Sequence, residues 1–185
     1  MQNEIEVRFL EINKDELLEK LKVLGADDHG EVMLEEVIIY DPELTWLKEK
    51  RFIRLRKSGE NITCTYKEHR AQAVDGAHEI EFNVTDLDKA CDLFEKIGLP
   101  PFRRQQKKRH TLTLGDTTID IDTWPNIPTY VELEGPSEET LRTVAKNLGF
   151  DWGKEAVFDD AKMVIEGRYG IPVGTLRWFT FDRIE

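Results

Sequence analysis

Apolar and charged residues alternate over much of the chain. From Glu4 to Ile12 nearly every second residue is apolar, which is the period of a β-strand with one buried face. The same alternation predicts strands at 31–40, 51–57, 61–68, 78–84, 102–114, 117–123 and 129–135. Most of these strands follow one another directly, so we expect an antiparallel sheet.

Four other segments carry apolar residues at helical spacing. Each follows a residue that can cap a helix and ends near a glycine. The capping residues are Asn13, Asp86, Ser137 and the pair Asp159/Asp160, and the glycines are Gly25, Gly98, Gly149 and Gly170. In the second helix we expect an inward face of Leu87, Ala90, Leu93, Phe94 and Ile97. Helices beside an antiparallel sheet indicate an α+β fold.

We expect residues 1–185 to form a single domain, because no linker rich in Pro, Gly or Ser divides the chain. The segment 171–185 contains Leu176, Trp178, Phe179 and Phe181. These side chains are too apolar to remain in water, so the segment should pack on the sheet or on a second subunit. Both a monomer and a homodimer remain open.

The net charge excludes some partners. The chain has 37 Asp and Glu against 26 Lys and Arg, a formal charge of −11. Such a chain is repelled by a nucleic-acid duplex and by an anionic membrane. We expect no signal peptide, because residues 1–4 form neither a basic region nor an apolar run, and the sequence has no run of about 18 apolar residues. Cys64 and Cys91 have no metal-like spacing and are expected in the core. We therefore expect a cytoplasmic protein.

Six of the predicted strands carry like-charged residues two positions apart, on one face of the strand. The pairs are Glu4/Glu6 (followed by Arg8), Arg54/Arg56, Glu79/Glu81, Lys107/Arg109, Asp120/Asp122 and Glu132/Glu134. The same period places residues 103, 105, 107 and 109 together on one face. Because like charges side by side destabilise a sheet, a bound ligand should compensate them.

The two kinds of charge indicate two kinds of ligand. Carboxylates without Cys or suitably spaced His select a hard cation such as Mg²⁺ or Mn²⁺. Arginines suit phosphate oxygens held in a bidentate fork. Together they describe metal-assisted phosphoryl chemistry. To surround such a ligand, the sheet would close into a barrel with a polar lumen.

These motifs resemble the CYTH domain, the triphosphate tunnel metalloenzyme superfamily. The segment 4–8 resembles its Glu-x-Glu-x-Lys signature, and the other charged pairs follow in the order of the family, with Lys67 after the arginine pair and Lys162 in a C-terminal helix. The resemblance implies an eight-stranded antiparallel β-barrel with flanking helices. Its tunnel would hold a triphosphate and one or two Mg²⁺ or Mn²⁺ ions.

The resemblance also implies roles for individual residues. As metal ligands it implies Glu4, Glu6, Asp120, Glu132 and Glu134. As triphosphate ligands it implies Arg54, Arg56, Lys67, Lys107, Arg109 and Lys162. It gives catalytic roles to Glu4, Glu6, Arg8 and Lys67. It implies that Glu79, Glu81 and Asp122 contact the ligating side chains rather than the ligand itself.

Two positions depart from the family pattern. Arg8 stands where the signature has Lys, and an arginine cannot lose its proton to act as a base. Its role would then be electrostatic. The loop 124–129 contains two prolines where many members have a Gly, which affects the tunnel mouth and so the choice of substrate.

The resemblance implies an enzyme that hydrolyses a triphosphate such as tripolyphosphate, thiamine triphosphate or a nucleoside triphosphate. Water activated by a metal ion would attack the terminal phosphorus in line. Two alternatives stay open. One is a class IV-type adenylate cyclase that makes cyclic AMP and pyrophosphate from ATP, and the other is a polyphosphate- or nucleotide-binding module without turnover.

Overall fold

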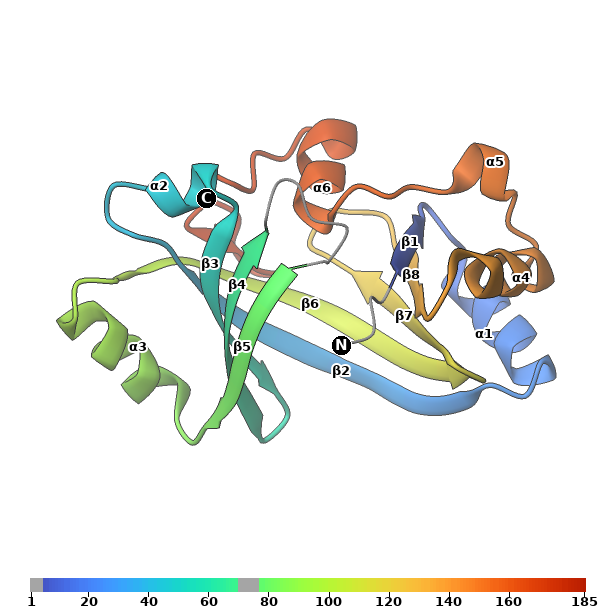
Figure 1. The fold of residues 1–185 in the computed structure, drawn as a ribbon, viewed down its shortest axis with the longest axis horizontal. Coiled ribbons are helices and arrows are strands. Elements are labelled where there is room, and N and C mark those ends of the chain that lie inside the picture. Colours follow the sequence, from blue (N-terminus) through green and yellow to red (C-terminus); the bar gives the residue numbers. More distant parts are fainter. Residues whose placement is uncertain (1–4, 70–76) are drawn as a thin grey trace. The chain divides into compact units, whose positions relative to one another are not determined.

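A computed structural model describes residues 5–69 and 77–185 of the chain. Its contacts divide the chain into two compact units. Unit 1 comprises Met1–Val32 and Lys108–Gly174, and unit 2 comprises Met33–Lys107 and Thr175–Glu185. Two long strands, β2 (Asp27–Ile39) and β6 (Pro101–Leu114), contribute residues to both units (Figure 1).

The strands form one sheet in the order β1-β8-β7-β6-β2-β3-β4-β5, with β9 paired to β6. The other bounds are β1 (Ile5–Phe9), β3 (Arg51–Ser58), β4 (Asn61–His69), β5 (Ala77–Val84), β7 (Thr117–Thr123), β8 (Tyr130–Gly135) and β9 (Trp178–Phe179). Every neighbouring pair with a defined register is antiparallel except β9 with β6. Among the described residues no hydrogen-bonded pairing joins β1 to β5. The predicted α+β class with an antiparallel sheet is confirmed.

The helices are α1 (Lys14–Val23), α2 (Thr45–Lys48), α3 (Leu87–Lys96), α4 (Glu138–Leu148), α5 (Trp152–Glu155) and α6 (Ala161–Tyr169). Four of the helices, α1, α3, α4 and α6, begin where the sequence indicates, and two short ones, α2 and α5, are additional. The side chains of Asn13, Asp86, Ser137 and Asp160 each accept a hydrogen bond from a backbone N–H of the first turn. Gly149 and Gly170 end their helices at positive φ, which glycine adopts without strain. The predicted caps are therefore confirmed.

Some predicted boundaries and faces are wrong. β1 ends at Phe9 rather than residue 12, and β2 begins at Asp27 rather than residue 31. In α3, Leu93 and Ile97 are 60% and 62% exposed, whereas we expected them to face inward. The small residues Ala90 and Cys91 let this helix lie close to the sheet, so its contact face is centred there.

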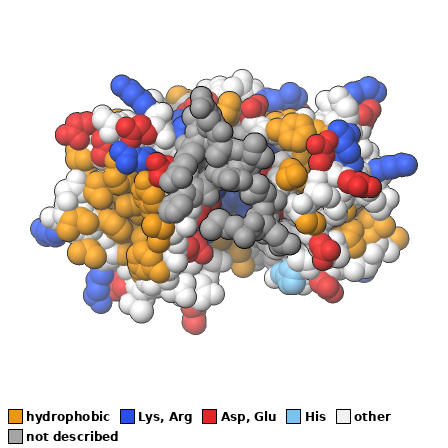
Figure 2. Space-filling view, in the orientation of Figure 1, with side chains coloured by type: hydrophobic (Ala, Val, Ile, Leu, Met, Phe, Trp, Pro, Cys, Tyr) orange, Lys and Arg blue, Asp and Glu red, His pale blue; other side chains and the backbone are white. Residues whose placement is uncertain are grey.

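Unit 2 therefore exposes apolar side chains beside α3. Ile80 and Phe82 of β5 are more than half exposed, as are Leu93 and Ile97. Figure 2 shows hydrophobic side chains gathered over α3 and β5.

Unit 1 has its own core on one face of β1, β8, β7 and the second half of β6. Val7 and Phe9 alternate with charged residues along β1, and Leu133 and Ile119 do so along β8 and β7. Helices α1 and α4, which lie side by side in Figure 1, cover this face with Leu17, Leu21, Leu141, Val144 and Leu148. The charged residues of these strands consequently point to the opposite face.

Unit 2 also has an apolar core between its strands and a helix. One core of Val37, Ile39, Ile53, Leu55 and Cys64 lies under α3. A second, smaller core of Ile38, Tyr40 and Phe102 packs against Phe52 at one end of the other face. Within the described part of the chain, no helix is both long and apolar enough to cross a membrane.

The C-terminal segment belongs to unit 2 and packs along the first half of β6. Arg104 donates a backbone hydrogen bond to the carbonyl oxygen of Arg177, at 2.9 Å. The Arg177 guanidinium lies 4.0 Å from the centroid of the Phe102 ring, and Phe179 is completely buried. This burial makes the segment part of the core of unit 2.

Replacing Phe179 should therefore destabilise the protein. We expect Phe179→Ala to lower the free energy of unfolding by about 3–5 kcal/mol, because it leaves a cavity in a packed core. Phe181→Ala, in the same segment but 42% exposed, is the matched control and should cost less than about 0.5 kcal/mol. Urea unfolding measures both, and equal losses would contradict the packing described here.

Candidate functional site

The charged face of unit 1, called here the acidic face, lies opposite its core. It carries Glu6 and Arg8 of β1, Glu132 and Glu134 of β8, Asp120 and Asp122 of β7, and Arg109 of β6. The strand register places Glu6 opposite Glu134, and Glu132 between Arg8 and Asp120. The sequence pattern thus brings these predicted residues together, while Glu4 lies outside the described residues.

Arg8 connects the acidic face to the segment before α6. It is only 4% exposed, and its Nη2 lies 2.5 Å from Glu132 Oε2 and 3.0 Å from Glu6 Oε1. Its Nη1 donates to the carbonyl oxygen of Asp159 at 2.6 Å, and its backbone pairs with Val157. A lysine presents one point charge, whereas the two terminal amino groups of arginine reach separate acceptors.

Arg8 holds a permanent positive charge. Burial alone would lower its pKa, but Glu132 and Glu6 outweigh that effect and raise the pKa above the ordinary value. Arg8 therefore keeps its proton and joins Glu6, Glu132 and the Asp159 backbone.

Arg109 binds the two aspartates of β7. Its Nε and Nη2 lie 2.7 Å from the two carboxylate oxygens of Asp122, and its Nη1 lies 2.5 Å from Asp120. Asp122 is completely buried, and the Tyr130 hydroxyl donates to it at 3.4 Å. Burial, followed by the negative charge of Asp122, raises the pKa of Tyr130. The predicted phosphate ligand Arg109 is thus already bound to carboxylates.

The acidic face has an excess of negative charge. Its five carboxylates outnumber its two guanidinium groups, and Glu6 and Glu134 lie directly opposite each other. Within the described part of the chain, no three acidic, His or Cys side chains are grouped closely enough to hold a metal ion. The donor set nevertheless fits a hard divalent cation in its chemistry, because it offers only oxygen atoms and surplus negative charge.

Lys162 is held by its own helix and by the chain after it. Its Nζ lies 3.9 Å from Glu166, whose carboxylate accepts a hydrogen bond from the backbone N–H of Gly174 at 2.6 Å. A Cβ atom at position 174 would lie 2.9 Å from Lys162 Cε. A larger residue at position 174 would therefore require the ends of the Lys162 and Glu166 side chains to shift.

Unit 2 has a charged face of opposite sign, called here the basic face. It carries Arg54, Arg56, Lys67, Arg103 and Lys107, together with Glu36, Glu79 and Glu81. Lys67 Nζ lies 2.6 Å from Glu79, and Thr65 donates to Glu81 at 2.6 Å. The two predicted supporting glutamates therefore contact the strand that carries Lys67.

Arg54 is the least compensated cation of the basic face. Its Nε is buried and has no hydrogen-bond acceptor among the described residues. Burial, followed by repulsion from Arg56, lowers its pKa despite the nearby glutamates. A half-buried guanidinium whose Nε–H is buried without an acceptor favours an added anion.

Sequence reasoning missed Glu36. It is 4% exposed and accepts hydrogen bonds from Arg56 Nε at 2.6 Å and from Gln105 Nε2 at 2.5 Å. Burial would raise its pKa, but the charges of Arg56 and its neighbours lower it to about 2. Glu36 follows another glutamate and precedes a continuous apolar run, so the alternation that marks the other strands is absent there.

The alternation from residue 103 onward, by contrast, is confirmed. Arg103, Gln105 and Lys107 are each less than 9% exposed. Arg103 Nε donates to Gln105 Oε1 at 2.8 Å. A hydrogen-bonded row therefore runs from Arg103 through Gln105 and Glu36 to Arg56.

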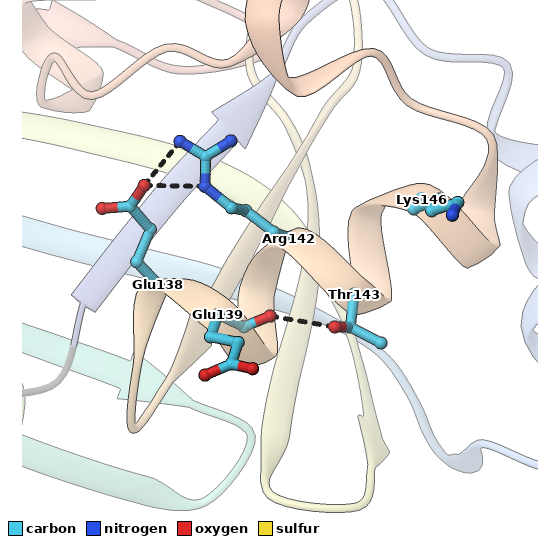
Figure 3. A pocket seen from close by; sticks show the side chains of 5 residues that line it. All are labelled: Glu138, Glu139, Arg142, Thr143 and Lys146. Carbon is cyan, nitrogen blue, oxygen red and sulfur yellow. Dashed lines mark hydrogen bonds and ion pairs between the residues drawn. The ribbon is translucent and has the colours of Figure 1, made fainter.

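Unit 1 has two surface hollows. One, of about 410 Å³, is a shallow depression on α4, lined by Glu138, Glu139, Arg142, Thr143 and Lys146 (Figure 3). There Arg142 pairs with Glu138, and Thr143 donates to the Glu139 carbonyl oxygen. The other, of about 480 Å³, lies between α1 and the end of α4. Neither contains a predicted site residue.

Removing Arg8 should be costly because it takes the 2.5 Å counter-charge from the buried carboxylate of Glu132. We expect Arg8→Met to lower the free energy of unfolding by about 3–5 kcal/mol. Arg168→Met removes an exposed ion pair with Glu11 and should cost less than about 1 kcal/mol. Urea unfolding at neutral pH compares the two, and a similar small loss in both would show that Arg8 does not hold the acidic face together.

Curated and solved proteins resemble this chain. A presumed adenylate cyclase of Methanocaldococcus jannaschii is 25% identical over 135 residues, which cover 71% of this chain and 75% of that protein.

Two solved structures share the fold. A presumed adenylate cyclase from Vibrio parahaemolyticus has a TM-score of 0.76 at 18% identity and covers 89% of this chain and 98% of its own. A presumed adenylyl cyclase from Hippeastrum, described as having a dominant triphosphatase activity, has a TM-score of 0.62 at 12% identity and covers 92% and 96%. The CYTH domain model matches residues 2–155, and the chain therefore belongs to the CYTH domain family.

Proposed function

We propose that the protein is a divalent-metal-dependent enzyme that hydrolyses a triphosphate. The observation that carries the proposal is the buried Nε of Arg54, which has no acceptor among the described residues and lies on a face with surplus positive charge. Family membership supports it, as does the triphosphatase activity described for the Hippeastrum protein. Candidate substrates are tripolyphosphate, thiamine triphosphate and nucleoside triphosphates.

In this proposal the basic face binds the phosphate chain. Arg54, Arg56 and Lys67 donate hydrogen bonds to its oxygens, with Lys107 adding positive charge nearby. Lys162 and Arg109 of unit 1 are further proposed phosphate ligands, and Arg109 would exchange part of its contact with Asp120 for phosphate. These cations stabilise the charge that develops on the leaving diphosphate.

The acidic face holds Mg²⁺ or Mn²⁺ in this proposal. The ligands would be Glu6, Asp120, Glu132 and Glu134, joined by Glu4. A bound divalent ion neutralises phosphate charge and lowers the pKa of water. Arg8 keeps Glu6 and Glu132 in place and, since it retains its proton, does not act as a base. Asp122 accepts two hydrogen bonds from Arg109 and so fixes its guanidinium.

The direct test is release of orthophosphate. With Mg²⁺ or Mn²⁺ we expect product from at least one of tripolyphosphate, thiamine triphosphate and ATP. Arg54→Ala should lower kcat/KM at least tenfold, because hydrogen bonds to charged groups contribute about 1.5–3 kcal/mol. Lys57→Ala is the control. It lies on the same strand but the opposite face, where it pairs with Glu35 at 3.6 Å, and should have little effect.

Two outcomes would contradict the hydrolase. One is the absence of orthophosphate from all three substrates with either metal. The other is binding of tripolyphosphate, measured by calorimetry, without product over hours, which would identify a binding module.

A second candidate is an adenylate cyclase, favoured by the names of the relatives from M. jannaschii and V. parahaemolyticus. In that reaction the ribose 3′-hydroxyl attacks the α-phosphate of ATP and pyrophosphate leaves. The same cations would bind the phosphates, so only the products distinguish the two reactions.

We expect ATP to yield ADP and orthophosphate, because the hydrolase is our leading proposal. Phosphorus NMR of the reaction with Mg²⁺ or Mn²⁺ identifies the products without labels. Cyclic AMP together with pyrophosphate as the main products would instead establish the cyclase.

A further inference from the structure

We propose that Glu36 is a positioning residue, which holds Arg56 so that its terminal amino groups bind the phosphate chain. The inference deepens the proposed function, on which its binding measurements rest. Glu36 itself would not touch the substrate.

The contact between Glu36 and Arg56 is made at one nitrogen. Glu36 Oε1 accepts from Arg56 Nε at 2.6 Å, and no bond from the terminal amino groups to a described residue accompanies it. A bidentate pair, such as Arg109 makes with Asp122, occupies Nε and one terminal nitrogen together. The single contact on Arg56 therefore fixes the guanidinium while it leaves both terminal nitrogens for oxyanions.

The other oxygen of Glu36 is fixed as well. Oε2 accepts from Gln105 Nε2 at 2.5 Å, and Gln105 Oε1 accepts from Arg103 Nε at 2.8 Å. Each group in this row therefore has a defined donor or acceptor role. Glu36 and Gln105 are both more than 90% buried, so water does not easily replace either bond.

Two roles of Glu36 can be distinguished by experiment: positioning Arg56 and acting only as a counter-charge. Glu36 is a negative group among Arg54, Arg56 and Lys107, so removing its charge makes the basic face more positive. If Glu36 acted only as a counter-charge, its neutralisation would tighten the binding of an anion. If it positions Arg56, neutralisation would weaken that binding. The two roles thus predict opposite signs.

The first variant is Glu36→Gln. The new amide can accept from Arg56 with its oxygen, but its NH₂ group then faces the NH₂ group of Gln105. Two donors in contact break the row. We expect the Kd for tripolyphosphate, measured by calorimetry with Mg²⁺, to rise at least tenfold. Glu35→Gln is the matched control, because it makes the same charge change on the other face of β2, and it should leave the Kd within about twofold.

The second variant exchanges the two side chains. In Glu36→Gln with Gln105→Glu, position 36 accepts from Arg56 and donates to position 105, whose carboxylate also accepts from Arg103. All three hydrogen bonds and the net charge are restored, so this protein should fold even if the single variant does not. We expect its Kd to return to within about threefold of the wild-type value.

A third measurement needs no ligand. In the ¹⁵N spectrum of the wild-type protein, the Arg56 Nε–H should be protected from exchange with solvent. Glu36→Ala should remove that protection, and the double exchange should retain it. This readout remains informative if the wild-type protein neither binds tripolyphosphate nor releases orthophosphate from any of the three candidate substrates, an outcome that would defeat the proposed function alone.

Clear results would overturn the inference. They are an unchanged or lower Kd in Glu36→Gln, a double exchange that fails to restore binding, or an Arg56 Nε–H that exchanges as fast in the wild-type protein as in Glu36→Ala.

Discussion

Charge that is removed from water must find a counter-charge, and this requirement organises both faces of the sheet. In unit 1, Arg8 and Arg109 are surrounded by carboxylates at 2.5–3.0 Å. An ion taken out of water without such a partner costs several kcal/mol. The registers of β1, β8 and β7 are set so that acids and arginines meet, while the alternate residues build the core.

The acidic face and the basic face are left with surplus charge of opposite sign. Five carboxylates against two guanidinium groups leave the acidic face negative, and five cations against three glutamates leave the basic face positive. Each surplus is what one component of a metal–triphosphate ligand would offset. The formal charge of −11 for the whole chain therefore does not exclude a small polyanionic ligand on the basic face.

The sequence allows much of this fold to be predicted because its alternation is so regular. Residues such as Asp120 and Ile119 differ so strongly in polarity that the strand and its two faces follow directly. The helix caps follow equally well from Asn13 and Ser137. The sequence could not predict which side chains from different strands contact each other. Glu36 lies beside an apolar run, and only the pairing of β2 with β3 brings it to Arg56. The contact face of α3 also depends on how closely a helix can approach the sheet, which its own sequence does not determine.

The segment Thr175–Glu185 has a consequence for how unit 2 folds. Unit 2 consists of Met33–Lys107 and this segment, and Phe179 fills part of that unit's core. The strand that carries Arg54 and Arg56 and the segment that completes its core are far apart in the sequence, with helices α4, α5 and α6 of unit 1 between them. Closing so long a loop costs chain entropy, so the core of unit 2 can be completed only after a long-range contact has formed.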